Sequence, residues 1–400
     1  MINEKYADYA WEQTAALLAI DSPSGFTRRA AEWVKDAFEA LGFPAKITTK
    51  GGVLADLGGE NADDGLFLEA HSDTLGAMVA QIKGSGRLRL TVVGGMEPNN
   101  AEAENVRIYT RSGKVYDGTC QLCNASVHVN GEYGSTKRSY DTVEVVPDED
   151  VSTAEDTRKL GIEVGDFVCF DPRTRRTASG YLKSRFLDDK LSVGILLGFA
   201  KYLADNHITL PRRTYVHVTV YEEVGHGGAS SVPAGVTEAI SVDMGCVGEG
   251  LSCTERQVSI CAKDSVGPYS YEVVGKLIDA AKRTGADYAV DVYPHYGSDV
   301  DVTLRAGFDI RHGLIGAGVF IAAYFLRAQP HRRRVQHPKG ALRISGRVSG
   351  QAFSWDRPRR PVPAAFWENI ACVLDCVRQI LYDNIKHMDE RGETLRTRIV

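Results

Sequence analysis

Two adjacent glutamates, Glu222 and Glu223, stand between an alternating stretch, residues 214–221, and a glycine-rich turn. In that stretch valines alternate with tyrosine, histidine and threonine, which is the two-residue period of a β-strand with different neighbours on its two faces. Neighbouring carboxylates resist joint ionisation unless something positive lies between or beside them. The pair therefore predicts a metal ion or a shared proton at the end of this strand.

Four more candidate side chains occur where predicted strands end or a helix begins. His71 ends the predicted strand 66–71 and is followed by Asp73, Asp243 ends the predicted strand 237–243, and Asp188 opens a predicted helix. A histidine at a strand end is by default a structural hydrogen-bonder, and acids that open a helix are commonly caps. Asp73 favours a ligand role for His71, because a ligating imidazole usually gives its other N–H to a carboxylate.

These side chains share the edge of a sheet at which open α/β folds build their sites. One histidine and several carboxylates form a nitrogen and oxygen ligand set suited to zinc, cobalt or manganese. Two metal ions about 3.5–4 Å apart need a bridging carboxylate, and a bound ion lowers the pKa of water to roughly 7. A carboxylate that is not a ligand can then act as general base, so adjacent glutamates can divide the work between base and ligand.

The elements that must position these residues follow an α/β pattern with an interruption. Two helices are predicted within residues 6–42, and strands and helices alternate again from Tyr181. Between residues 77 and 178 short strands and turns predict a small β-barrel or sandwich inserted in the α/β domain. We expect an α/β fold in which a mixed sheet is flanked by helices.

Composition excludes several classes of protein. The chain has 400 residues, 43% of them hydrophobic, and a formal net charge of -5, which gives no indication of a nucleic-acid or anionic-membrane partner. No apolar run is long enough to span a membrane, and the first residues lack the order of a secretion signal. We expect a cytoplasmic protein whose eight cysteines are reduced. Cys120 and Cys123 lack a matching second pair for a zinc ribbon.

Four ordered motifs, HSDTLGAMV, FLDDKLSVG, YEEVGHGGAS and SVDMG, resemble the co-catalytic metallo-aminopeptidases of the glutamyl/tetrahedral type, peptidase family M forty-two in clan MH. The resemblance covers about residues 10–319 and implies a zinc-peptidase type of fold and a two-metal, glutamate-base mechanism. It implies the following roles: His71 and Asp243 as terminal ligands, Asp188 as the bridge, Glu223 as a ligand, Glu222 as general base and Asp73 as the residue that orients His71. Gly297, Ser298 and Asp299 resemble a family loop near the substrate.

The place of the insertion separates this family from related carboxypeptidases and deacylases, whose second domain follows the paired glutamates. The resemblance implies a catalytic domain of residues 1–76 and 179–319 and an inserted domain, residues 77–178, that serves assembly and substrate access. It also implies peptide substrates, two zinc or cobalt ions with manganese as a further option, and a homo-oligomer between dimer and dodecamer.

The pattern breaks after Val319, where the family's last ligand, a histidine, is missing. Residues 320–361 are basic and contain Asp356 as their only acid, so residues 320–400 can be a basic tail or an anion-binding arm. A third hypothesis is a one-base insertion or deletion near codons 319–323. Codons for residues 331–338 can be chosen so that the shifted frame reads I-E-G-V-F-N-T, preceded by H-I-F-Y-E-R-N-H, with the missing histidine encoded across the Ala323 and Tyr324 codons.

If the chain is as printed, one metal has lost a ligand, and His331 or His337 are weak substitutes. Two alternatives to an aminopeptidase follow. An amidase or deacylase would use the same chemistry on non-peptide substrates, and an inactive scaffold would keep the fold without turnover. The sequence does not determine the preferred N-terminal residue, the native metal or the oligomeric state.

Overall fold

The computed structural model describes residues 4–178, 181–322 and 325–328, together with Cys372, Val373, Asp375, Cys376, Arg378 and Gln379. Residues 323, 324 and 331–338, on which the reading-frame hypothesis rests, lie outside the described residues, and so does nearly all of the predicted basic tail, including His331 and His337.

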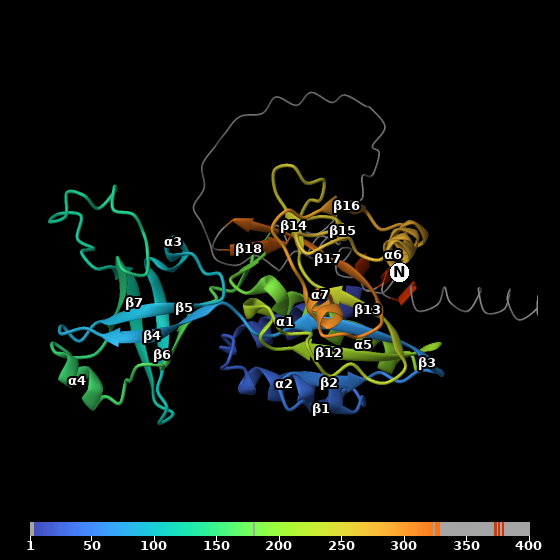
Figure 1. Ribbon diagram of the computed structural model, residues 1–400, viewed down its shortest axis with the longest axis horizontal. Helices are drawn as coiled ribbons and strands as arrows, with labels where there is room; N and C mark the ends of the chain where they lie inside the picture. Colours follow the sequence, from blue (N-terminus) through green and yellow to red (C-terminus); the bar gives the residue numbers. More distant parts are fainter. Residues whose placement is uncertain are drawn as a thin grey trace, which may run out of the picture.

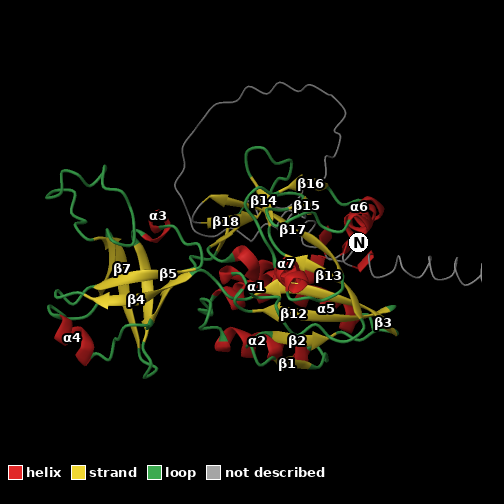
Figure 2. Ribbon diagram, in the orientation of Figure 1, coloured by secondary structure: helices red, strands yellow, loops and turns green. Residues whose placement is uncertain are grey.

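A mixed sheet forms the centre of the α/β body, as Figures 1 and 2 show. Within the described residues it has twelve strands, and its main path runs β1-β2-β12-β3-β13-β17-β18-β11-β10. Its strands are β1 (Ala45–Ile47), β2 (Val53–Asp56), β3 (Asn61–His71), β10 (Arg175–Arg176), β11 (Leu182–Ser184), β12 (Arg212–Thr219), β13 (Val236–Val242), β14 (Gly245–Val247), β15 (Val258–Lys263), β16 (Tyr288–Val292), β17 (Arg311–Ala322) and β18 (Phe325–Ala328). β12 and β13 both pair in parallel with β3, which therefore lies between them.

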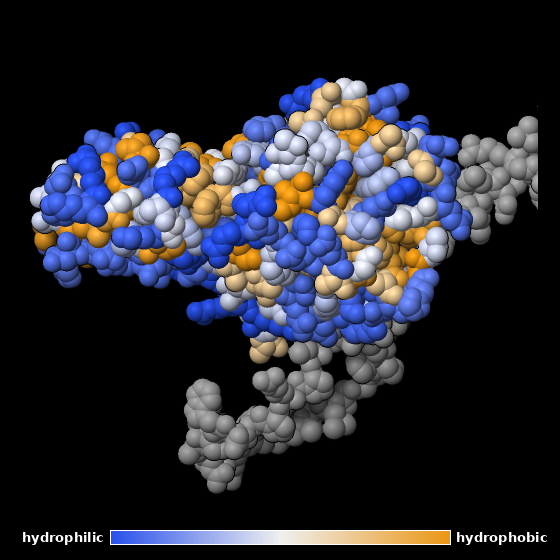
Figure 3. Space-filling model, turned by 90° about the horizontal axis from the view of Figure 1, so that it is seen from below, coloured by the Kyte–Doolittle hydropathy of each residue, from blue (hydrophilic) through white to orange (hydrophobic). Residues whose placement is uncertain are grey.

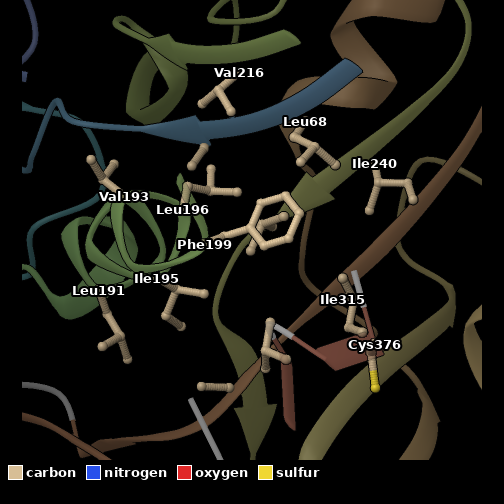
Figure 4. Packing of buried hydrophobic residues seen from close by; sticks show 14 of the residues in the cluster. Leu68, Leu191, Val193, Ile195, Leu196, Phe199, Val216, Ile240, Ile315 and Cys376 are labelled. Carbon is tan, nitrogen blue, oxygen red and sulfur yellow. The ribbon is translucent and has the colours of Figure 1, made fainter. Parts of the chain in front are cut away.

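Helices cover both faces of this sheet, which confirms the predicted fold class. They are α1 (Glu4–Leu18), α2 (Arg28–Ala40), α5 (Leu187–Asp205), α6 (Tyr271–Thr284) and α7 (Asp299–Arg305). The alternation along β12 assigns the faces, because Val216 points toward α5 (Figure 4) while Thr219 donates a hydrogen bond to Asp299 of α7.

α5 is apolar around most of its circumference, which is typical of a helix with neighbours on all sides. Phe199 of α5 lies among Leu68, Val216 and Ile240 of the three central strands (Figure 4). On the side toward α1, a Cβ added at Gly194 would lie 2.0 Å from the Thr14 hydroxyl, so glycine permits the close approach of the two helices. α5 is thereby packed between the central strands and α1.

The stretch between β3 and β10 contains a closed barrel with the strand order β4-β5-β8-β7-β6-β9. Its elements are β4 (Gly76–Ile82), β5 (Leu88–Val93), α3 (Pro98–Ala101), β6 (Glu104–Tyr109), β7 (Val115–Leu122), β8 (Val143–Pro147), α4 (Ala154–Lys159) and β9 (Phe167–Phe170). The alternate residues Val106 and Ile108 of β6 point into its core. The barrel projects from the α/β body as a lobe with its own core (Figure 3).

All eight cysteines are free thiols. None of the helices described is both long and apolar enough to cross a membrane.

Candidate active site

Parallel pairing brings three strand ends to one edge of the sheet. His71 is the last residue of β3 and pairs with Thr219, the last residue of β12. Glu222 and Glu223 follow in a short 3-10 helix, η1 (Glu222–Val224), and Asp243 follows β13 directly. Because the carboxyl ends of parallel neighbours meet at the same edge, residues far apart in the sequence converge there.

Asp188 reaches this edge from the first turn of α5. Its backbone angles, φ -76 and ψ 103, are not helical, so the chain approaches the site before the regular helix begins. His71 Nε2 lies 3.1 Å from Asp188 Oδ1 and 3.6 Å from Glu222 Oε2. The next residue, Asp189, accepts a hydrogen bond from the main-chain N–H of His71 at 3.3 Å.

Asp73 is fully buried and holds both the imidazole and the paired glutamates. His71 Nδ1 lies 3.0 Å from the main-chain oxygen of Asp73 and 3.6 Å from its carboxylate. Since a carbonyl oxygen only accepts, the first contact places a proton on Nδ1 and directs Nε2 into the site. The Asp73 carboxylate also accepts the main-chain N–H groups of Glu222 and Glu223, at 3.2 and 3.3 Å.

The structure brings the six predicted residues together at this edge. Potential ligand atoms of His71, Asp189 and Asp243 all lie within 4.8 Å of one another. The charge of Asp188 raises the pKa of both Asp243 and Glu223, so its carboxylate lies near both side chains. Asp189 is the member that the sequence analysis left without a role, although two adjacent acids at a helix start were a signal for it.

The electrostatics of this cluster call for a cation. Burial raises the pKa of Glu222, Glu223 and Asp189 well above the usual carboxyl range. Burial and the charge of Asp188 raise the pKa of Asp243 to about 7. Burial opposes the charged imidazolium of His71, but the carboxylates of Glu222 and Asp188 outweigh it and raise the pKa of His71 well above its usual value. One imidazole cannot balance so many buried carboxylates.

An unsatisfied atom shows that the site suits a metal ion. Asp189 Oδ1 is buried and has no hydrogen-bond partner among the described residues. An oxygen in that state loses solvation without compensation, which a divalent cation would supply. Carboxylate oxygens with an imidazole nitrogen are ligands for zinc and its first-row neighbours.

A second layer of buried polar groups lies behind the site, on the side of α7. Glu69 Oε1 lies 3.0 Å from His217 Nδ1, and Glu69 Oε2 accepts a hydrogen bond from Thr303 at 2.7 Å. Burial raises the pKa of Glu69 to about 8 and lowers that of His217 to about 4, so burial favours the neutral form of both side chains. The sequence analysis placed His217 on the polar face of its strand without assigning it a partner.

The fold and this acid-rich edge are those of a metal-dependent peptidase. The chain belongs to the M42 glutamyl aminopeptidase family, whose sequence profile matches residues 51–321. It is 41% identical over 321 residues to YhfE of Bacillus subtilis (strain 168), a protein classed as an aminopeptidase, over 80% of this chain and 92% of that one.

Two solved structures share the fold. The TET aminopeptidase from the marine sediment archaeon Thaumarchaeota archaeon SCGC AB-539-E09 aligns with a TM-score of 0.76 and 15% identity, over 95% of this chain and 99% of that one. The TET1 peptidase of Pyrococcus horikoshii, which can assemble into a tetrahedron or a large octahedral shell, aligns with a TM-score of 0.68 and 20% identity, over 80% of this chain and 94% of that one.

Proposed function

We propose that this protein is an aminopeptidase that removes N-terminal residues from peptides with the help of two divalent metal ions. The observation that carries the proposal is the meeting of His71, Asp188, Glu223 and Asp243 around one edge of the sheet, with Glu222 beside them. Family membership supports the same reaction class.

We assign the ligand roles from the geometry and the family pattern together. Asp188 is the bridge because it contacts His71 and its charge acts on both Glu223 and Asp243. His71 and Asp243 are terminal ligands, and Glu223 completes the set. The ions would be zinc or cobalt, with manganese as a further candidate, since the donors are nitrogen and oxygen.

Bound ions would polarise the scissile carbonyl and activate water. Glu222 is the general base, which takes a proton from the attacking water and returns it to the amine that leaves. Its raised pKa, caused first by burial, suits a carboxylate that must both accept and release a proton near neutral pH. Asp73 keeps the imidazole of His71 and the Glu222 main chain in place, and an acidic group at the site holds the substrate's free amine.

The chain after residue 321 bears on the level of activity. The family profile ends at that residue, which supports a change of sequence character near Val319. If the last histidine ligand is absent, one metal ion binds weakly and turnover falls. A full complement of two tightly bound ions with turnover typical of this class, measured on the purified 400-residue protein, would contradict this part of the proposal.

We further propose that residues 77–178 act as a separate domain that serves assembly and substrate access in a cytoplasmic homo-oligomer. The closed barrel with its own core and the resemblance to an assembling peptidase support this role. Gel filtration coupled to light scattering measures the oligomeric state, and a monomer at micromolar concentration would remove the proposal.

The function is tested by metal analysis together with a substrate panel. Purified protein, stripped with a chelator and reloaded with zinc, cobalt or manganese, is assayed on aminoacyl-arylamides and on N-acyl amino acids. Hydrolysis of the arylamides alone is expected. Hydrolysis of N-acyl amino acids alone would indicate an amidase or deacylase, and metal-loaded protein without either activity would indicate an inactive scaffold.

A further inference from the structure

The segment Asp21–Ser24, here called the strap, connects the barrel to the buried carboxylate of Asp73. Its residues lie between α1 and α2 and are buried, although they belong to neither helix. Two main-chain hydrogen bonds, from Ser24 to Thr74 and from Thr74 to Ser22, fix the strap against the chain that leaves the site. The strap therefore lies where the barrel and the α/β body join.

At its first residue the strap is bound to the barrel. Arg107 of β6 donates two hydrogen bonds to the Asp21 carboxylate, at 2.6 and 2.7 Å, and Tyr109 of β6 donates a third at 2.7 Å. A bidentate pair between guanidinium and carboxylate fixes orientation as well as distance. Phe26, just beyond the strap, stacks on Phe167 of β9, with ring centroids 5.2 Å apart.

At its last residue the strap is bound to the site. Ser24 donates its hydroxyl proton to Asp73 Oδ2 at 2.5 Å, and both groups are almost completely buried. The same oxygen accepts the main-chain N–H of Glu223, and its twin accepts that of Glu222. Ser24 is thus the side chain that fixes how the Asp73 carboxylate faces the paired glutamates.

The fit at this junction is close on both sides. A Cβ added at Gly76, the first residue of β4, would lie 2.6 Å from Pro23 of the strap. Lys190 of α5, next to the Asp188–Asp189 pair, donates to the main-chain oxygen of Ile20 at 2.6 Å. The strap is therefore packed against the barrel, against the segment that follows His71 and against the start of α5.

We propose that Ser24 is a positioning residue for the active site, and that the strap couples the seating of the barrel to the orientation of Asp73. This inference rests on the proposed aminopeptidase function. A shift of the barrel moves Arg107 and with it Asp21 of the strap. The strap then moves Ser24, which reorients Asp73. A reoriented Asp73 changes the positions of Glu222 and His71.

The test compares Ser24→Ala with Ser24→Thr, which keeps the hydroxyl, and with Ser184→Ala as a matched control. Ser184 is buried, and its hydroxyl bonds to Thr174 and Pro172 instead of to a site residue. Loss of a group that orients a metal ligand typically costs about 10–100-fold in activity or metal affinity. We expect Ser24→Ala to lower kcat by about 10-fold with KM little changed, and Ser24→Thr to recover most of it. Normal kcat in Ser24→Ala would overturn the proposal.

Absorption spectra of the cobalt-loaded protein give a second readout that does not need turnover. We expect the visible bands to change in Ser24→Ala and to stay unchanged in Ser184→Ala. If the wild-type protein hydrolyses no arylamide, the proposed function fails while the spectra still test Ser24. An unchanged spectrum in a folded Ser24→Ala protein would overturn its positioning role.

Coupling to the barrel is tested with Arg107→Gln alone and combined with Ser24→Ala. Residues that act through one path give non-additive effects, whereas independent sites add. We expect Arg107→Gln to lower kcat several-fold in the wild-type background and to have little further effect in Ser24→Ala. Equal fold-changes in both backgrounds would overturn the coupling.

Discussion

His71 Nε2 lies 3.1 Å from Asp188 Oδ1, although the whole barrel separates these two residues in the chain. The contact joins the end of β3 to the start of α5, so the site is complete only when the two segments that flank the barrel have docked on each other. Substitutions at this junction can therefore distinguish residues needed for turnover from residues needed for metal binding.

Glu222→Gln is expected to abolish turnover while leaving metal bound. The amide keeps the shape of the side chain but cannot accept the proton of the attacking water. Arylamide hydrolysis and metal content by mass spectrometry are measured on the same preparation, with Glu60→Gln on an exposed turn as control. Substantial turnover in Glu222→Gln would remove this residue as the base.

Asp188→Asn is expected to lower the affinity for both metal ions, because a bridging carboxylate is a ligand of both. Asp243→Asn is expected to lower the affinity mainly for one ion. Calorimetric titration of the stripped protein gives both affinities, and Asp279→Asn, exposed on α6, is the matched control. Loss of only one ion in Asp188→Asn would show that Asp188 is terminal and would direct attention to Asp189.

Alanine substitutions at two glycines, one closely surrounded and one with free space around it, are expected to change the free energy of unfolding in opposite directions. A Cβ at Gly316 would lie 1.6 Å from the main-chain oxygen of Asp243, whereas a Cβ at Gly275 in α6 meets nothing within 4 Å. We expect Gly316→Ala to lower the free energy of unfolding by about 3 kcal/mol, at the upper end of the cost of overpacking. We expect Gly275→Ala to raise it by about 0.5–1 kcal/mol, since alanine favours the helix.

Urea unfolding of both variants beside the wild type measures these changes. Metal affinity should also fall in Gly316→Ala, because the displaced main chain carries Asp243. Equal stability of the two variants would show that β17 yields at Gly316 without cost.

Protonation of His217 is expected to make the free energy of unfolding depend on pH. Its folded pKa of about 4 lies below the ordinary 6.5, so the unfolded chain takes up a proton first as pH falls. Stability from this residue is therefore present above pH 6.5 and is lost progressively down to about pH 4, by about 2 kcal/mol between pH 7 and pH 5. The measurement is the free energy of unfolding at both pH values in wild type and His217→Gln.

The variant should lose less stability than the wild type between these two pH values. An identical loss in both proteins would mean that His217 is already charged in the folded state. Glu69 provides the opposite trend, because its raised pKa makes the unfolded chain release its proton first as pH rises.

The sequence predicted the α/β class, an inserted domain of short strands and the meeting of the acids, because strand periodicity and parallel strand ends are local patterns with a fixed spatial meaning. It could not choose between barrel and sandwich, since closure depends on the pairing of β4 with β9 far along the chain. Asp189 and Ser24 escaped for a different reason. Their roles follow from contacts with His71 and Asp73 that no spacing rule contains.

The chain leaves the α/β body for the barrel just after β3 and returns to it at β10 and β11, which precede α5. The first and last strands of the barrel pair with each other, Ala77 with Val168, so its two points of attachment are close neighbours in space. We expect that such an insertion can change in size without moving the proposed metal ligands, provided that its contacts with the strap are kept. The barrel can thus vary while the α/β body that carries the proposed active site stays the same.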